Sequence, residues 1–125
     1  MLGNDQIVAF VATRDGAKAR RFYEQVLGLR LISDEPWAIV FDAAGTTIRV
    51  QKVEAFAPQT FTVLGWEVAD IDAAVAELAR RDVRFERYAG MDQDERGVWR
   101  SPSGARVAWF KDPDGNTLSI TQLGP

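Results

Sequence analysis

Polar and apolar residues alternate on both sides of one turn sequence, Asp112-Pro113-Asp114-Gly115. Proline presets one φ angle there, and aspartate and glycine tolerate the positive φ that a tight turn requires. The flanking segments, "RVAWF" and "NTLSITQ", are therefore predicted to form the two arms of a β-hairpin. Strand periodicity puts three small hydroxyl side chains, Thr117, Ser119 and Thr121, on one face of the second arm.

The chain contains the same pattern twice. Residues 6–31 and 61–85 each read as an apolar strand, an aspartate, an amphipathic helix and a second strand. Asp15 and Asp70 precede the two helices, where a carboxylate accepts hydrogen bonds from the unpaired N–H groups of the first turn. A hairpin follows in each half, so the sequence predicts a duplicated β-α-β-β-β unit. We expect one domain over residues 1–125, with modules at about 5–53 and 61–123.

Apolar residues recur at helical spacing in both halves and predict the helix faces that pack on the sheets. The stripes are Ala19, Phe22, Tyr23, Val26 and Leu27 in the first half, and Ile71, Ala74, Val75, Leu78 and Ala79 in the second. Gly28 follows the first helix in the position of a C′ glycine. The second half is longer by 15 residues between helix and hairpin, because Asp15 and Asp70 are 55 residues apart whereas Gly45 and Gly115 are 70 apart.

The extra residues fall within the segment "YAGMDQDERGVWRSPSG", residues 88–104. A loop this long in a compact domain is commonly functional or mobile. One interpretation makes it a lid with Trp99 as an aromatic wall, and the other makes it an ordinary excursion with Trp99 buried in the core or against a partner subunit. Asp92 and Asp94 begin like a calcium loop, but Arg96 and Ser103 stand where two of its ligands belong, so calcium binding is not expected.

Strand alternation also predicts which side chains lie on the sheet faces opposite the helices. These faces collect Val8, Phe10, Thr47, Arg49, Val63, Glu67 and Ser119. A mainly apolar surface with a few convergent polar groups is typical of a small-molecule cup. The alternative is a partly solvated face on which Glu67 and Arg49 form an ordinary cross-strand ion pair. Trp109, Phe10 and Trp37 are candidates for either ligand contact or core packing.

The amino-acid composition excludes several kinds of catalytic and metal-binding site. The chain has no histidine and no cysteine, which excludes a Ser-His-Asp triad, a thiolate nucleophile and a zinc finger. Its net charge of −3 and pI of about 4.9 disfavour nonspecific nucleic-acid binding. The apolar runs are too short to cross a membrane and no secretory signal pattern is present, so we expect a cytoplasmic protein.

Three motifs give the chain a resemblance to a known family. "RFYEQVLGLRL", "EVADIDAAVAEL" and "FKDPDGNTLSI" resemble segments of the glyoxalase/bleomycin resistance/extradiol dioxygenase proteins, the vicinal oxygen chelate superfamily, from about residue 6 to residue 122. The resemblance implies an α+β fold in which two tandem β-α-β-β-β modules form a curled, incompletely closed eight-stranded barrel. It also implies four metal-ligand positions, which fall on Val8, Arg49, Val63 and Ser119. Enzymes of the family have His and Glu at such positions, so the usual metal site is absent and no cofactor is expected.

The function that follows from this resemblance is metal-independent binding of a small molecule, either a drug or a metabolite. The ligand would contact Val8, Phe10, Val63, Trp99 and Trp109 and be oriented by Thr47, Arg49, Glu67 and Ser119. The family also implies a homodimer and suggests a role in antibiotic resistance. A lyase, isomerase or dioxygenase-like enzyme is the alternative, with Glu67 as base and Arg49 as electrostatic stabiliser, or with an atypical metal site. A third possibility is a structural dimer whose cup is filled by its own side chains.

Overall fold

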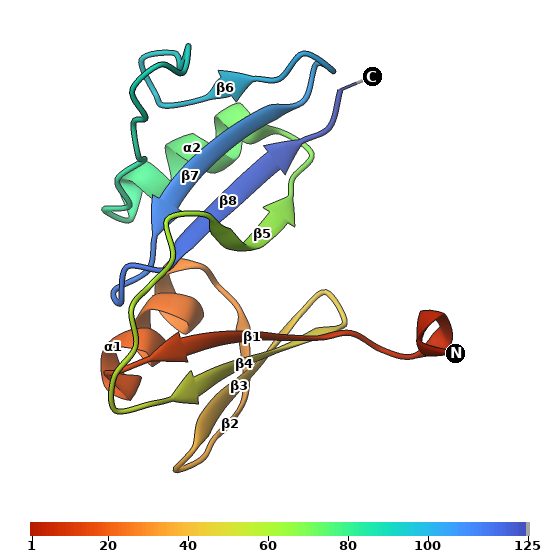
Figure 1. The fold of residues 1–125 in the computed structure, drawn as a ribbon, viewed down its shortest axis with the longest axis vertical. Coiled ribbons are helices and arrows are strands. Elements are labelled where there is room, and N and C mark those ends of the chain that lie inside the picture. Colours follow the sequence, from red (N-terminus) through yellow and green to blue (C-terminus); the bar gives the residue numbers. More distant parts are fainter. Residues whose placement is uncertain (125) are drawn as a thin grey trace. The chain divides into compact units, whose positions relative to one another are not determined.

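The computed structural model describes residues 1–124, and the chain divides into two compact units at Ala57 and Pro58 (Figure 1). Both units have the same order of elements, a strand, a helix and then three strands. Each unit contains one four-stranded mixed sheet, and neither sheet closes into a barrel. The duplicated unit predicted from the pattern and the α+β class implied by the resemblance are therefore confirmed.

The first unit begins with a short 3-10 helix and builds its sheet in the order β1-β4-β3-β2. Its elements are η1 (Leu2–Asn4), β1 (Val8–Thr13), α1 (Gly16–Arg21), the π-helix η2 (Phe22–Val26), β2 (Arg30–Asp34), β3 (Ala38–Ala43) and β4 (Thr46–Lys52). Strand β1 pairs with β4 in parallel, and the β2–β3 and β3–β4 pairs are antiparallel. Because β4 has neighbours on both sides, its side chains are held in the middle of the sheet.

The helix of the first unit begins and ends where the sequence predicts. The Asp15 carboxylate accepts a hydrogen bond from the Lys18 backbone N–H at 3.2 Å. Gly28 takes a φ of 77°, which only glycine adopts without strain, and the Leu29 N–H then bonds the Tyr23 carbonyl at 2.9 Å. The sequence did not indicate the π-helical turn between these ends, in which the Leu27 N–H reaches back to the Phe22 carbonyl at 2.9 Å.

Aromatic and aliphatic side chains between this helix and the sheet form the core of the first unit. Tyr23 and Phe41 are fully buried, with ring centroids 5.9 Å apart. Ile39, Ile48 and Val50 are buried beside them on β3 and β4. Burying side chains of this size supplies the main stabilising term for the unit, roughly 1.5–3 kcal/mol for each one.

The second unit repeats the topology, with sheet order β5-β8-β7-β6 and a parallel β5–β8 pair. Its elements are β5 (Thr62–Glu67), α2 (Ile71–Arg80), β6 (Trp99–Arg100), β7 (Arg106–Lys111) and β8 (Thr117–Gln122). The strand expected to end at Phe85 is reduced to a single bridge with Phe110, and the inserted segment supplies the edge strand β6 instead. A two-residue edge strand leaves few unpaired backbone groups for another chain to bind.

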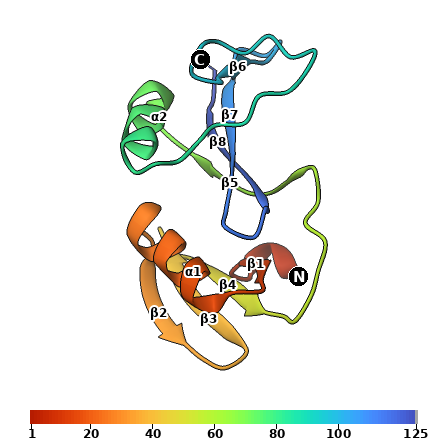
Figure 2. The same cartoon turned by 90° about the vertical axis from the view of Figure 1, so that its left-hand side faces the viewer.

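Helix α2 covers one face of β7 and β8. Figure 2 shows it on one side of the sheet, whereas the loop leading to β6 reaches the other side. The Asp70 carboxylate accepts from the Ala73 N–H at 3.1 Å, which confirms the predicted N-cap, and the Gln122 side-chain oxygen accepts from the Ile71 N–H at 2.9 Å. Within residues 1–124, no helix has the length and apolar character needed to span a lipid bilayer.

Candidate functional site

The sheet face of the second unit that lies opposite α2 is lined by the hydroxyl row of β8. Thr117 and Ser119 are buried, with exposed fractions of 2% and 8%, and Thr121 is half-buried. Small hydroxyls at these positions leave room above the sheet that larger residues would fill. The side chain of Trp109 on the neighbouring strand β7 occupies part of that space.

The indole of Trp109 lies across β8. Trp109 is the β7 partner of Ser119, yet its Nε1–H donates a hydrogen bond at 3.0 Å to the hydroxyl of Thr62 on β5. Since β7 and β5 flank β8 on opposite sides, the ring must span β8 to make this bond. Register breaks between Thr62 and Leu64, and this bulge lets Thr62 share the outer face with Thr117.

Gly65 makes room for Ser119. The two residues are register partners, and a Cβ atom at position 65 would lie 2.6 Å from the Ser119 hydroxyl oxygen and 3.3 Å from the Ser119 carbonyl oxygen. Both distances are shorter than ordinary van der Waals contacts. A glycine at this position is therefore what permits a side chain on β8 to lie against β5.

Two more aromatic rings surround Trp109. Tyr88 meets it edge-on, with centroids 5.5 Å apart and planes at 82°, and Trp99 lies 6.0 Å away at 38°. These separations are in the range where aromatic pairs attract. Burial raises the pKa of the Tyr88 hydroxyl, with a smaller contribution from the negative charge of Glu86. Tyr88 is therefore a neutral wall of this aromatic cluster, which consists of Tyr88, Trp99 and Trp109.

The segment that delivers Trp99 is held by its own hydrogen bonds. The Gln93 side-chain amide donates to the carbonyls of Glu86 and Gly97 at 2.9 and 2.8 Å and accepts from the Tyr88 N–H at 2.7 Å. One Asp94 carboxylate oxygen accepts from the N–H groups of Arg96 and Val98. The segment around Gln93 is therefore an organised turn, with Val98 buried at its end.

Glu67 and Val63 complete the β5 side of this face. Glu67 is exposed and is the register partner of Thr121, so it lies on the outer face two residues beyond Gly65. Val63 stands in the bulge and is 37% exposed. In the described part of the chain Glu67 makes no ion pair, so its carboxylate is available to a ligand or to water.

The corresponding face of the first unit has different chemistry. Val8 and Phe10 on β1 are 43% and 52% exposed, although both are apolar. Their β4 register partners are Thr47 and Arg49, and both of these are half-buried. The predicted site residues are thus divided between the units, with Val8, Phe10, Thr47 and Arg49 in the first and Val63, Glu67, Trp99, Trp109 and Ser119 in the second.

The side chains at the four implied metal positions do not fit a divalent metal. Val8 and Val63 offer no donor atom, Arg49 offers a cation, and Ser119 offers only a hydroxyl. Across residues 1–124, no three carboxylate, imidazole or thiol side chains gather closely enough to hold a metal ion.

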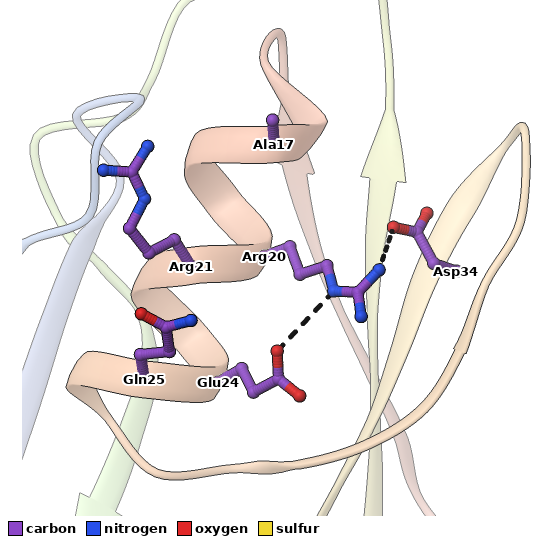
Figure 3. A pocket seen from close by; sticks show the side chains of 6 residues that line it. All are labelled: Ala17, Arg20, Arg21, Glu24, Gln25 and Asp34. Atoms are coloured by element: carbon purple, nitrogen blue, oxygen red, sulfur yellow. Dashed lines mark hydrogen bonds and ion pairs between the residues drawn. The ribbon is translucent and has the colours of Figure 1, made fainter.

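An open hollow of about 360 Å³ lies on the outer side of the first helix (Figure 3). It is lined by Ala17, Arg20, Arg21, Glu24, Gln25 and Asp34. Arg20 pairs there with Glu24 at 3.6 Å and with Asp34 at 3.2 Å, and Lys52 bonds Asp34 at 2.7 Å. The hydrogen bond from Lys52, more than that from Arg20, lowers the pKa of Asp34. This network ties helix to sheet and neutralises its own charges.

Sequence reasoning missed three residues that organise the second unit's face. Thr62 receives the indole N–H, Tyr88 closes the ring cluster, and Gln93 holds the loop. The sequence left Trp109 open between ligand contact and core packing and did not indicate its acceptor, because the bulge that turns Thr62 outward leaves no mark in the polar and apolar pattern. A glutamine that bonds only backbone atoms likewise looks like any other polar loop residue.

Comparison with known proteins agrees with the topology. The structure resembles a glyoxalase/bleomycin resistance protein/dioxygenase superfamily member from Sphaerobacter thermophilus (25% identity, TM-score 0.74, 94% of this chain and 95% of that chain). It also resembles TnmS3, an antibiotic binding protein from Streptomyces sp. CB03234 (23%, 0.71, 97% and 97%), and the lactoylglutathione lyase of Agrobacterium tumefaciens (16%, 0.74, 95% and 93%).

Sequence comparison is more decisive about the family. The search of curated proteins finds no match. The family model of the Glyoxalase/Bleomycin resistance protein/Dioxygenase superfamily matches residues 5–120, which is nearly the whole chain. The chain therefore belongs to the glyoxalase/bleomycin resistance protein/dioxygenase superfamily.

Proposed function

We propose that the protein binds a small molecule without a metal, and that the outer sheet face of the second unit contacts this ligand. The observation that carries the proposal is the placement of the Trp109 indole above the hydroxyl row of β8. The ring is held by Thr62, Tyr88 and Trp99, so little side-chain freedom is left to lose on binding. A pre-organised indole is a good surface for a flat aromatic ligand.

Polar groups around the indole support selectivity. Glu67 lies on the same face at the β5 edge, and its exposed carboxylate can accept hydrogen bonds from a ligand. The fold that this chain shares with an antibiotic binding protein supports a binding role, since the same fold holds a ligand there. A role in drug resistance and the choice between drug and metabolite are part of this proposal.

The test is a calorimetric titration with a neutral, flat aromatic probe, naphthalene-2-sulfonamide. We expect Trp109→Ala to weaken binding by about tenfold or more, as for an anchor residue at the centre of a contact surface. Thr62→Val, which removes the indole's acceptor and keeps the shape, should weaken it less. Trp37→Phe is the matched control, because Trp37 is a 61% exposed tryptophan of the first unit.

Two outcomes would contradict the proposal. One is equal affinity of the wild type and Trp109→Ala for the probe. The other is stoichiometric zinc, nickel, iron or manganese in the purified protein together with loss of binding after chelation. Either result would mean that the indole face is not the ligand surface of a metal-independent binder.

The alternative function is a lyase, isomerase or dioxygenase-like enzyme, which the exposure of the Glu67 carboxylate favours. As a general base this group needs access to substrate, and its position on the outer face supplies that access. Glu67→Gln separates the two functions. A binder keeps its affinity for an uncharged aromatic ligand, whereas an enzyme loses nearly all turnover while it retains substrate binding.

We further propose that the protein works as a cytoplasmic homodimer. Strand β1 is an edge strand, since its one partner in the sheet is β4, and the apolar side chain of Ile7 directly before it is 74% exposed. Exposed apolar edge strands commonly pair with another chain. Light scattering at micromolar concentration tests this, and a monomer at all concentrations would contradict it.

A further inference from the structure

On the outer sheet face of the first unit, Arg49 is a charged group for which residues 1–124 supply no ion pair. Arg49 is at the centre of β4, with Phe10 as its register partner on β1 and Val40 as its partner on β3. Val40 is 8% exposed, so the guanidinium stem stands on an apolar surface. No carboxylate pairs with Arg49 in the part of the chain that the structure describes.

The acidic side chains nearest in register to Arg49 are already engaged. Asp42 is the partner of Thr47, diagonal to Arg49, and it forms an ion pair with Arg30 at 3.6 Å. Glu35 accepts a hydrogen bond at 3.2 Å from the hydroxyl of Ser33 on β2. Ser33 pairs with Val40 and is therefore two strands from Arg49, roughly 10 Å away at ordinary strand spacing.

We infer that this face binds a small anion with an apolar body, through Arg49. A half-buried guanidinium without a carboxylate partner keeps its donors free for a ligand, and its planar fork matches a carboxylate or sulfonate with two hydrogen bonds. The exposed Phe10 ring and Val8 side chain beside it would contact the apolar part of the ligand. The inference goes beyond the function proposed above, because it concerns the first unit and assigns a charge to the ligand.

Two probes of the same shape isolate the contribution of charge. Naphthalene-2-sulfonate carries the anion, and naphthalene-2-sulfonamide is its neutral counterpart. Calorimetry on the full chain should show that the sulfonate binds at least about tenfold more tightly, as a charge-assisted hydrogen-bond pair implies. Added salt should reduce this preference, because it screens a half-exposed charge.

Variants assign the preference to one side chain. Arg49→Gln should reduce the ratio of the two affinities to about one, while Arg49→Lys should retain part of the preference because it keeps the charge but loses the fork. Arg30→Gln is the matched control, since Arg30 lies on the same face and already pairs with Asp42. It should leave the ratio unchanged. Thermal melts of each variant check that the fold is intact.

Three binding results would overturn the inference, and so would one change of assembly. They are equal affinities of the two probes for the wild type, a preference that survives Arg49→Gln, and failure of the sulfonate to bind at millimolar concentration. A change of oligomeric state in Arg49→Gln would also overturn it, since Arg49 would then be held by an acidic group of a second copy. Equal binding of both probes that still depends on Trp109 would leave the proposed function standing.

Discussion

The two sheets have the same topology, but their outer faces differ in chemistry. In the second unit the outer face is covered by the indole of Trp109, and Ser119 beneath it is buried. In the first unit the equivalent central strand carries Arg49, and the neighbouring Phe10 is 52% exposed. The comparison shows that duplication preserves the directions of side chains and that exchange of a few residues decides the chemistry of each face.

The largest expected effect on stability comes from comparing two phenylalanines of the first unit, one on each face of its sheet. Phe41 is fully buried, whereas Phe10 is exposed on the opposite face. We expect Phe41→Ala to lower the free energy of unfolding by about 3–5 kcal/mol and Phe10→Ala by less than about 1 kcal/mol. Urea unfolding measures both. A large loss for Phe10→Ala would mean that this face is covered in solution, and the contrast between the units would fail.

A smaller effect is expected where β5 meets β8. Gly65→Ala places a methyl group 2.6 Å from the Ser119 hydroxyl oxygen, and overpacking of this kind costs about 1–3 kcal/mol. Ser119→Ala in the same chain removes that oxygen and should recover part of the loss, although the contact with the Ser119 carbonyl remains. Thermal unfolding of the single and double variants measures this coupling. Additive effects would show that Gly65 is not making room for Ser119.

The smallest expected effect concerns Asp34, which pairs with Arg20 of the first helix and with Lys52. The pKa of Asp34 is lowered from 3.8 by hydrogen bonds from Lys52 and Arg20. A lowered pKa in the folded state stabilises the fold above pH 3.8, and this contribution is lost as pH falls through the folded-state pKa. Asp34→Asn should lower the melting temperature by about 1–4 °C at pH 7 and by less at pH 2.

The exposed loop carboxylate of Asp92 offers the matched control for this pH experiment. Asp92→Asn should leave the melting temperature nearly unchanged at both pH values, because surface substitutions without partners have small effects. A melting-temperature difference for Asp34→Asn that is the same at pH 2 and pH 7 would contradict the proposed role of its ionised form.

Local chemistry explains which parts of the fold could be predicted. The N-caps at Asp15 and Asp70 and the Gly28 helix end depend on residues close in the chain, so their signals are visible in the sequence. Strand β6 could not be predicted, because two residues carry no periodicity and the pairing with β7 is decided by the inserted loop. The π-helical turn at residues 22–26 likewise breaks the ordinary helical spacing without a special residue.

The sequence predicts the sheet face on which several site residues lie, but not the contacts that their side chains make. Alternation identifies the outer positions Arg49, Glu67 and Ser119 from the residue pattern alone. It says nothing of where a long side chain comes to rest, because that depends on neighbours distant in sequence. The indole of Trp109 reaches Thr62, 47 residues away, and Gln93 bonds only main-chain groups.

The bonding pattern of Gln93 has an evolutionary consequence. Because the Gln93 amide and the Asp94 carboxylate fasten the loop through peptide groups, the loop's shape depends on few of its own side chains. Met91, Asp92 and Glu95 are free to vary while Trp99 stays beside Trp109. Selection for a new ligand can therefore change the exposed side chains of the loop without disturbing the scaffold, provided that Gln93 and Asp94 are kept.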